Sequence, residues 1–220
     1  MEGNKNMSKK TIIISGIAIG LLLIIALICI VHSEKGNRVK NLYEKITQNQ
    51  NFTFSMEEIN SKIKYKVFMA QRGTDVSIDM YSEDEHTTTI VLEDDAYYIN
   101  HNDQEYYDFG EENVEADIVL YGLENFTKDK YETGREEING KSYYYEEYEN
   151  NNMEFIMYAN ANEESNIKIR FYFDGDELAY IKNIVTNKDG QEEELLKTSL
   201  VYSVDDSLFV VPEDYAETDE

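Results

Sequence analysis

The chain is short of cysteine and proline, and each shortage excludes a class of protein. Its 220 residues include one cysteine, one proline and no tryptophan. Because Cys29 is the single thiol, the chain cannot form a disulfide framework or a thiolate zinc site of its own. A content of 41% hydrophobic and 12% aromatic residues also excludes a proline-rich stalk and a mostly solvated tail. The composition therefore predicts one globular domain with a sizeable core.

Basic residues are scarce as well. Lysine and arginine together number 20 against 45 acidic residues, which gives a formal net charge of −25. Such a surface repels phosphate backbones, so we expect no nucleic-acid partner. Solubility explains the acidity more simply than a patch evolved for a cationic partner does.

The sequence contains one long hydrophobic run. Thr11 to Val31 contains no charged residue, and about 20 apolar residues are enough to cross a hydrocarbon core of about 30 Å. The run lacks a small-x-small cleavage site after it, and bulky Ile28 precedes Cys29 where a lipidation signal needs a small residue. The sequence therefore predicts an uncleaved transmembrane helix over residues 11–31, and with it a membrane partner.

The residues that flank the run indicate how the predicted helix is oriented in the membrane, and its glycines indicate whether two such helices could pair. Lys5, Lys9 and Lys10 favour a cytoplasmic tail over residues 1–10, and long domains translocate largely regardless of flanking charge. We therefore expect a single-pass protein of the cell membrane with an extracytoplasmic C-terminal domain. Gly16 and Gly20 form a GxxxG pattern, which would let two such helices pack as a weak dimer.

The remainder of the chain changes from helical to strand periodicity. Val39, Leu42, Tyr43 and Ile46 fall at i, i+3, i+4 and i+7, which predicts an amphipathic helix over residues 34–48. From Phe52 onward the period is two. The clearest strand pattern sets apolar residues against lysines: Ile63, Tyr65, Val67 and Met69 alternate with Lys62, Lys64 and Lys66.

Turn signals divide this second part into short strands. Gln71-Arg-Gly73, Glu93-Asp-Asp95 and Asn139-Gly140 supply the conformations that tight hairpins need. The pattern predicts about ten to eleven antiparallel strands, of which Leu208 to Val211 is the last. Residues 111–130 interrupt the strands and are expected to form one or two short helices.

A sheet of this length must curl, and a curled sheet with one apolar face needs filling. We therefore predict an α+β fold, mainly antiparallel β, in which a half-barrel sheet wraps around the amphipathic helix and the short middle helices. This domain covers residues 32–215, and residues 216–220 form an acidic tail.

The order of these elements resembles the LolA-like and LppX-like lipoprotein-carrier half-barrels of bacterial envelopes. The resemblance covers Val39 to Tyr215 and is carried by the amphipathic helix, the strand meander and two short motifs. These motifs are Ile138-Asn-Gly-Lys-Ser-Tyr143, similar to a Gly-Lys-x-Tyr strand start, and Leu208-Phe-Val-Val-Pro-Glu-Asp-Tyr215, similar to a closing Leu-Phe-x-x-Pro-x-x-Tyr. The resemblance implies a non-enzymatic binder of acyl chains or of another apolar ligand. Because the carriers are soluble or lipidated, a helix-tethered relative is expected to be a binding or sensor domain rather than a shuttle.

The expected ligand site is a slot between the amphipathic helix and the concave face of the sheet. Its lining residues come from the helix and from neighbouring strands: Val39, Leu42, Tyr43, Ile46, Phe54, Met69, Ile78, Phe155, Phe171 and Val201. The same inward residues serve equally well in a fully packed interior. The alternative is therefore a structural or interaction protein of the cell envelope that has no small-molecule ligand.

Motifs for catalysis and for cofactor binding are missing from the sequence. It contains no GxSxG, no P-loop, no GxGxxG and no Cys/His pair, so we expect no enzyme, no catalytic residues and no cofactor. His86 and His101 are fifteen residues apart beside turns and are interpreted as surface histidines, so no metal site is expected. The carboxylates of residues 174–177 and 189–194 are interpreted as hairpin turns rather than as calcium loops.

Overall fold

The computed structural model describes residues 37–60, 65–110, 123–124, 126–149 and 165–218. Residues from Arg38 onward form one compact unit. The predicted transmembrane helix over residues 11–31, the dimer contact through Gly16 and Gly20, and Phe155 all lie outside the described residues.

The prediction of a single-pass membrane protein needs correction. No helix within the described ranges is long and apolar enough to cross a membrane. The structure therefore does not support the predicted span, the membrane partner or the localisation built on it.

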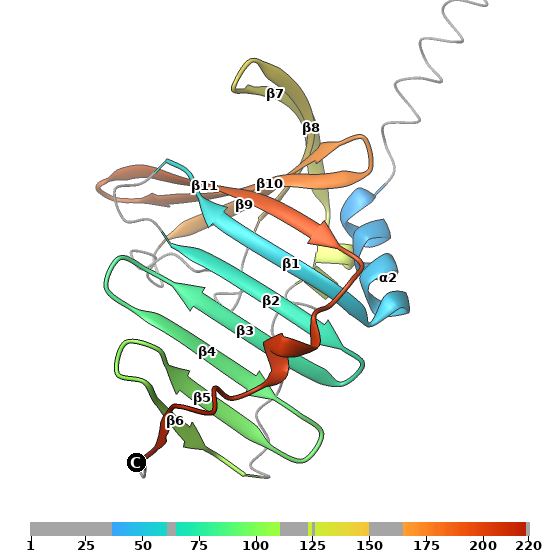
Figure 1. Ribbon diagram of the computed structural model, residues 1–220. Coiled ribbons are helices and arrows are strands. Elements are labelled where there is room, and N and C mark those ends of the chain that lie inside the picture. Colours follow the sequence, from blue (N-terminus) through green and yellow to red (C-terminus); the bar gives the residue numbers. More distant parts are fainter. Residues whose placement is uncertain (1–36, 61–64, 111–122, 125, 150–164, 219–220) are drawn as a thin grey trace, which may run out of the picture. The chain divides into compact units, whose positions relative to one another are not determined.

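Twelve strands form one sheet (Figure 1), in the order β12-β6-β5-β4-β3-β2-β1-β11-β10-β9-β8-β7. All neighbouring strands pair antiparallel except β12 and β6, which are parallel. The strands are β1 (Asn51–Glu58), β2 (Lys66–Arg72), β3 (Asp75–Tyr81), β4 (His86–Val91), β5 (Ala96–Asn100), β6 (Glu105–Asp108), β7 (Tyr131–Ile138), β8 (Lys141–Glu149), β9 (Asn166–Asp174), β10 (Glu177–Asn187), β11 (Gly190–Val201) and β12 (Ala216–Glu217).

The predicted fold class needs correction in two respects. Among the described residues the sheet has twelve strands rather than about ten to eleven, and no transmembrane helix precedes it. The sheet is open. Closure into a barrel requires the two edge strands to meet. One edge here is the two-residue strand β12, and the other is β7, whose exposed residues are mainly charged. Short and charged edges are devices that prevent further strand pairing.

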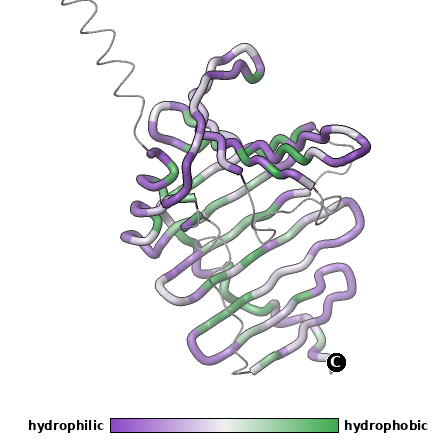
Figure 2. The backbone as a smooth tube through the Cα atoms, turned by 180° about the vertical axis from the view of Figure 1, so that it is seen from behind, coloured by the Kyte–Doolittle hydropathy of each residue, from purple (hydrophilic) through white to green (hydrophobic). Residues whose placement is uncertain are grey.

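Helix α2 (Arg38–Asn49) covers one face of the sheet. Val39, Leu42 and Ile46 are buried in a core cluster with residues of β1, β2, β8, β9, β10 and β11, as the helical periodicity predicted. Leu123 and Phe126 join the same cluster from a short helical stretch, where the Phe126 ring packs edge-on against Tyr148 and Phe171. Figure 2 shows these hydrophobic stretches in green beside α2.

A buried carboxylate caps the first turn of α2. Glu146 of β8 is 0% exposed, and its two oxygens accept hydrogen bonds from the backbone amides of Arg38 (2.8 Å) and Val39 (3.1 Å). The hydroxyl of Tyr148 donates to the same carboxylate at 3.0 Å. The first amides of a helix lack intrahelical partners and carry partial positive charge, so a carboxylate there is stabilising. Burial and the charge of Glu146 raise the pKa of Tyr148.

The C-terminal segment covers the opposite face. After β11 the chain forms the 3-10 helix η2 (Asp206–Phe209) and crosses the strands to reach β6, where β12 pairs (Figure 1). Phe209 packs against Ala70, Ile90 and Ile99. The predicted strand from Leu208 to Val211 was wrong, because Asp205 accepts a hydrogen bond from the Ser207 amide and caps a helical turn instead.

The predicted register of the lysine-alternating strand agrees with the structure where it is described. Val67 and Met69 are buried in the core cluster, whereas Lys66 beside them is exposed. Tyr65 packs against the cluster from just before β2. Residues 61–64, which include the rest of this pattern, lie outside the described ranges.

Candidate functional site

The residues predicted to line a slot pack against one another. Those of α2, β1, β2 and β9 are buried within a single cluster: Val39, Leu42, Ile46, Phe54, Met69 and Phe171. Tyr43 and Ile78 are partly buried against that cluster. Val201 is 50% exposed and does not belong to it. The space between α2 and the described strands is therefore occupied by the side chains that were expected to line it.

A cavity of about 170 Å³ lies beside this core, at the ends of β2, β3 and β4. Cross-strand pairing brings its walls together, because Val67 is paired with Met80 and Met80 with Thr87. Val67 belongs to the buried cluster, whereas Met80 and Tyr81 at the rim are 46% and 41% exposed. The remaining lining residues are Tyr65, Lys66, Ser82 and Glu85. The cavity is thus mainly apolar inside and open to solvent at the hairpin between β3 and β4.

One wall of the cavity is fixed by a buried polar contact. The hydroxyl of Tyr65 donates to Glu194 of β11, and the side-chain amide of Asn183 donates to the other oxygen of Glu194 at 2.7 Å. Glu194 and Asn183 are both buried. Tyr65 is thus linked through Glu194 to β11 and β10, on the far side of β1.

A second cavity, of about 270 Å³, lies between α2 and Asp176. Its lining is mainly charged and polar: Arg38, Asn41, Glu44, Lys45, Gln48 and Asp176, with Leu42 as the apolar member. A cavity of this character offers little to an apolar ligand, so the cavity beside β3 and β4 is the better candidate.

The face opposite α2 carries a cluster of titratable side chains. Asp79 on β3, His86 on β4 and His101 just after β5 have ligand atoms that all lie within 4.8 Å of one another. The backbone amide of His101 donates to the carbonyl of His86 at 3.0 Å, which sets the two histidines side by side. Their rings stack with centroids 3.8 Å apart, and Tyr81 stacks on the other side of His86 at 3.9 Å.

The hydrogen bonds of the cluster determine where its protons lie. A carboxylate only accepts, so Asp79 receives hydrogen bonds from His86 Nε2 (2.9 Å) and from the Thr88 hydroxyl (2.7 Å). The single proton of Thr88 is then used, so His101 Nε2 donates to Thr88 Oγ1 at 2.7 Å. His101 Nδ1 consequently accepts from the hydroxyl of Tyr215 at 2.9 Å. Neutral His101 satisfies every one of these contacts.

The environment keeps His101 neutral. Burial lowers the pKa of His101, the neighbouring His86 lowers it further, and the charge of Asp79 opposes this only in part. An unperturbed histidine has a pKa of about 6.5. His101 is therefore an unprotonated imidazole at neutral pH, which is the form that binds metal ions.

The sequence interpretation treated these two histidines as isolated and missed their contact. A signal was present, because Glu93-Asp-Asp95 had been recognised as a turn. A hairpin folded about that turn pairs Thr87 with Asn100, and the next residues outward are His86 and His101. Counting outward from the turn would have placed the two rings together.

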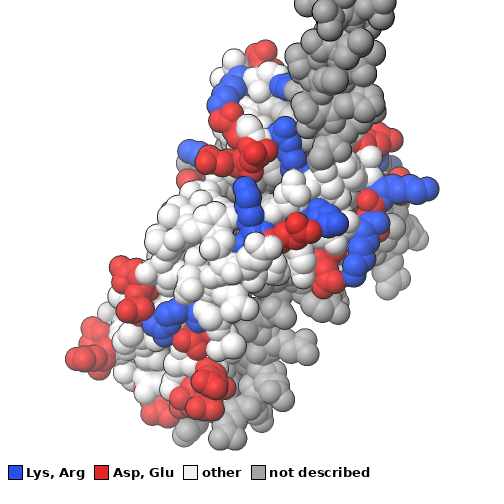
Figure 3. Space-filling view, turned by 90° about the vertical axis from the view of Figure 1, so that its right-hand side faces the viewer, with Lys and Arg blue, Asp and Glu red and all other residues white. Residues whose placement is uncertain are grey.

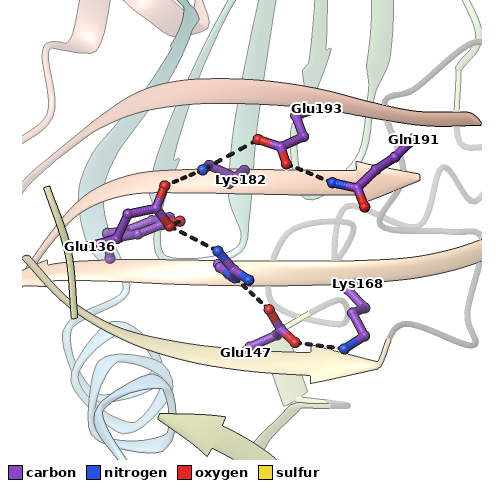
Figure 4. A network of polar contacts seen from close by, with 8 residues as sticks. Glu136, Glu147, Lys168, Lys182, Gln191 and Glu193 are labelled. Carbon is purple, nitrogen blue, oxygen red and sulfur yellow. Dashed lines mark hydrogen bonds and ion pairs between the residues drawn. The ribbon is translucent and has the colours of Figure 1, made fainter. Parts of the chain in front are cut away.

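A different polar network occupies the same face on β7 to β11 (Figure 4). Glu136 accepts hydrogen bonds from Arg170 (2.8 Å), Tyr172 (2.7 Å) and Lys182 (2.5 Å). Glu147 accepts from Lys168 at 2.8 Å and from Arg170 Nε. Burial alone would raise the pKa of both glutamates, but the hydrogen bonds and positive charges of Lys168, Arg170 and Lys182 outweigh it, and each pKa is lowered.

Charge is unevenly spread over the surface seen in Figure 3. Acidic side chains predominate in the lower part of that view, whereas basic and acidic side chains alternate in the upper part. The acidic turns of residues 83–85 and 93–95 are exposed, so the hairpins around β4 carry unneutralised negative charge.

Comparison with known proteins assigns no family. No known protein-family profile matches the sequence, and no curated protein is similar enough in sequence to match. Among solved structures, an uncharacterized conserved protein of Thermus thermophilus aligns over 81% of this chain and 97% of its own, with a TM-score of 0.48 and 5% identity. A hypothetical protein of Chlamydia trachomatis aligns over 81% and 96%, with a TM-score of 0.33 and 9% identity. Likeness at this level carries no argument on function, and the resemblance to the LolA-like half-barrels stays a prediction.

Proposed function

We propose that residues 38–220 form a non-enzymatic binding domain that takes a small apolar group into the cavity beside β3 and β4. The observation that carries this proposal is the combination of a buried apolar wall, Val67, with an exposed apolar rim, Met80 and Tyr81. Large apolar side chains that are exposed together beside a cavity are typical of ligand-binding surfaces. Because side chains fill the predicted slot under α2, we place the proposed ligand in the cavity beside β3 and β4 instead.

The size of the cavity limits the ligand. An apolar cavity of about 150 Å³ holds one benzene molecule in another protein, so a cavity of about 170 Å³ accommodates one ring, a short alkyl chain or the end of a longer one. Each buried methylene contributes about 0.8 kcal/mol before the entropy of association is subtracted. Affinity should therefore rise with chain length only until the cavity is filled, and then level off.

The test is a titration of the full chain with linear alcohols of increasing length, measured by calorimetry. We expect saturable binding with one site, and an affinity that rises with length and then reaches a plateau. Met80→Lys places an ammonium group at the rim and should abolish binding, because its charge would have to be desolvated by the apolar ligand. Val201→Lys is the matched control, since Val201 is equally exposed but does not line the cavity.

The control variant also tests whether the ligand occupies the cavity beside β3 and β4 or a site near Val201. If Val201→Lys weakens binding as much as Met80→Lys does, the ligand does not occupy the cavity beside β3 and β4. If the wild-type chain shows no saturable binding at any length, the alternative of a structural or interaction protein with a packed interior replaces this proposal. The close packing between α2 and the sheet is the observation that favours that alternative.

A further inference from the structure

The cluster of Asp79, His86 and His101 has the composition of a metal site. Two imidazoles and one carboxylate are ligands typical of zinc and of neighbouring divalent transition metals, and three protein ligands leave a coordination position open. We propose that Asp79, His86 and His101 bind one divalent transition-metal ion of the zinc type on the face opposite α2. This site shares no ligand residue with the proposed apolar cavity, although Tyr81 at the rim of that cavity stacks on His86. Neither proposal depends on the other.

The three ligand atoms lie close enough to reach one ion, but binding requires one of the stacked rings to turn. All three ligand atoms lie within 4.8 Å of one another, whereas ligands about 2.0–2.2 Å from a tetrahedral zinc ion are about 3.3–3.5 Å apart. The two imidazole rings are stacked with 19° between their planes. One ring must therefore rotate about its Cβ–Cγ bond so that both Nε2 atoms face the ion. Both histidines are intermediate in exposure, which leaves room for that rotation.

The hydrogen-bond partners suit the metal-bound form as well as the empty one. A metal ion takes the lone pair of Nε2, so the proton of a neutral imidazole then sits on Nδ1. In His101 this Nδ1–H would donate to Tyr215, whose hydroxyl oxygen can accept as well as donate. An outer partner of this kind fixes the ring and its tautomer in metal sites. The hydroxyl of Thr88 still donates to Asp79 and holds the carboxylate in place.

The charge and the ligand types select the kind of ion. The chain carries a formal charge of −25, and the exposed acidic turns beside β4 raise the local concentration of cations. Calcium and magnesium prefer sets of oxygen ligands and bind poorly to imidazole. A site with two imidazoles should therefore take zinc in the presence of excess magnesium, which a purely acidic surface would not do.

The experiment uses the full chain, freed of metal with a chelator and titrated with zinc chloride in excess magnesium. We expect one equivalent to bind saturably. His86→Gln and His101→Gln should each weaken binding by at least about 100-fold, and Tyr215→Phe by about 10-fold. His32→Gln is the matched control, because His32 is the remaining histidine of the chain, and it should leave the affinity unchanged. Binding should weaken as the pH falls, since protons compete with the metal ion for its ligands.

A second measurement does not depend on whether the variants fold. In the wild-type chain with ¹⁵N-labelled histidine, zinc should shift the Nε2 resonances of two histidines and leave the third unchanged. The proposal is wrong if zinc binds without these shifts, or if the His86→Gln/His101→Gln double variant keeps the wild-type affinity. Either result would mean that the acidic surface alone holds the ion.

Discussion

Two polar clusters lie on the same face of one sheet, and they differ in how their charges are matched. In the network of Glu136 and Glu147, each carboxylate contacts at least two cations, and Lys182 is only 9% exposed. In the cluster around Asp79, no lysine or arginine takes part: the carboxylate accepts hydrogen bonds from His86 and Thr88, and His101 is joined through Thr88. The strand register places both clusters on one face, because alternation carries from β3 through β2, β1, β11 and β10 to β9. The register shift in the β9–β10 pair lies between Leu178 and Tyr180, to one side of the pair Lys182 and Arg170.

The two clusters therefore suit different roles. Carboxylates paired with lysine and arginine side chains stay charged over a wide range of pH. This network therefore suits a structural contact between β7, β8, β9 and β10. Imidazole groups change state near neutral pH and exchange their partners easily. The cluster around Asp79 is thus the one that can respond to its surroundings.

The largest expected effect comes from breaking the ion network. Glu136→Ala leaves Lys182 buried without its nearest carboxylate and removes a partner of Arg170. Removing one member of a partly buried ion pair should lower the free energy of unfolding by about 2–3 kcal/mol. Urea denaturation measures this change.

The matched control is the neighbouring residue on the same strand. Glu137 is exposed, so Glu137→Ala should change the free energy of unfolding by no more than about 0.5 kcal/mol. Equal effects of the two substitutions would show that the network contributes nothing beyond a surface charge.

The two clusters should lose stability in different ranges of pH. Unfolded glutamate has a pKa of about 4.3, and the pKa values of Glu136 and Glu147 are lowered in the folded chain. Below about pH 4.3 the unfolded chain therefore binds more protons, and stability falls with pH. The pKa of His101 is also lowered, from about 6.5 in the unfolded chain. The contribution of His101 to the free energy of unfolding therefore decreases as the pH falls below about 6.5.

Unfolding in urea across this range separates the two contributions. The wild-type chain should lose stability in two steps, a smaller one below about pH 6.5 and a larger one below about pH 4.3. His101→Gln should remove the first step and leave the second. A first step that persists in this variant would have to come from another group, and the neutral state assigned to His101 would be wrong.

The smallest expected effect concerns an ion pair in the same half of the sheet that is open to water. Lys141 and Asp174 form a salt bridge in which both side chains are more than half exposed. Exposed pairs contribute little because water and salt screen them, so Lys141→Ala should leave the urea midpoint unchanged. A clear loss of stability would contradict the view that burial decides how much an ion pair stabilises the fold, both in the Glu136 network and in the exposed pair.

Local patterns in the sequence predicted local structure well. The spacing of Val39, Leu42 and Ile46 predicted the buried face of α2, and the alternation of Val67 and Met69 with Lys66 agrees with the burial pattern of β2. These features depend on side-chain periodicity over a few residues. Features that depend on distant partners were not predicted. Glu146 lies in a tyrosine-rich strand, and its role as a cap depends on an amide 107 residues away.

The last strand was missed for a related reason. Ala216 and Glu217 form β12 because they pair with β6, and no local pattern near Ala216 contains that information. The cluster around Asp79 was missed because the histidines were judged by their spacing along the chain rather than across the β4–β5 hairpin. Tyr215, which completes it, lies 114 residues from His101.

The position of β1 in the strand order has a consequence for biosynthesis. β1 lies between β2, which follows it directly, and β11, and the Thr53 hydroxyl donates to the carbonyl of Ser203, 150 residues later. At about 5–20 residues per second, a ribosome needs roughly 8–30 s to make that length of chain. During this time β1 to β6 can pair as a meander while one edge of β1 stays unpaired. An open edge of this kind invites pairing with another nascent chain, so the interval before β11 emerges is when this protein is most exposed to aggregation.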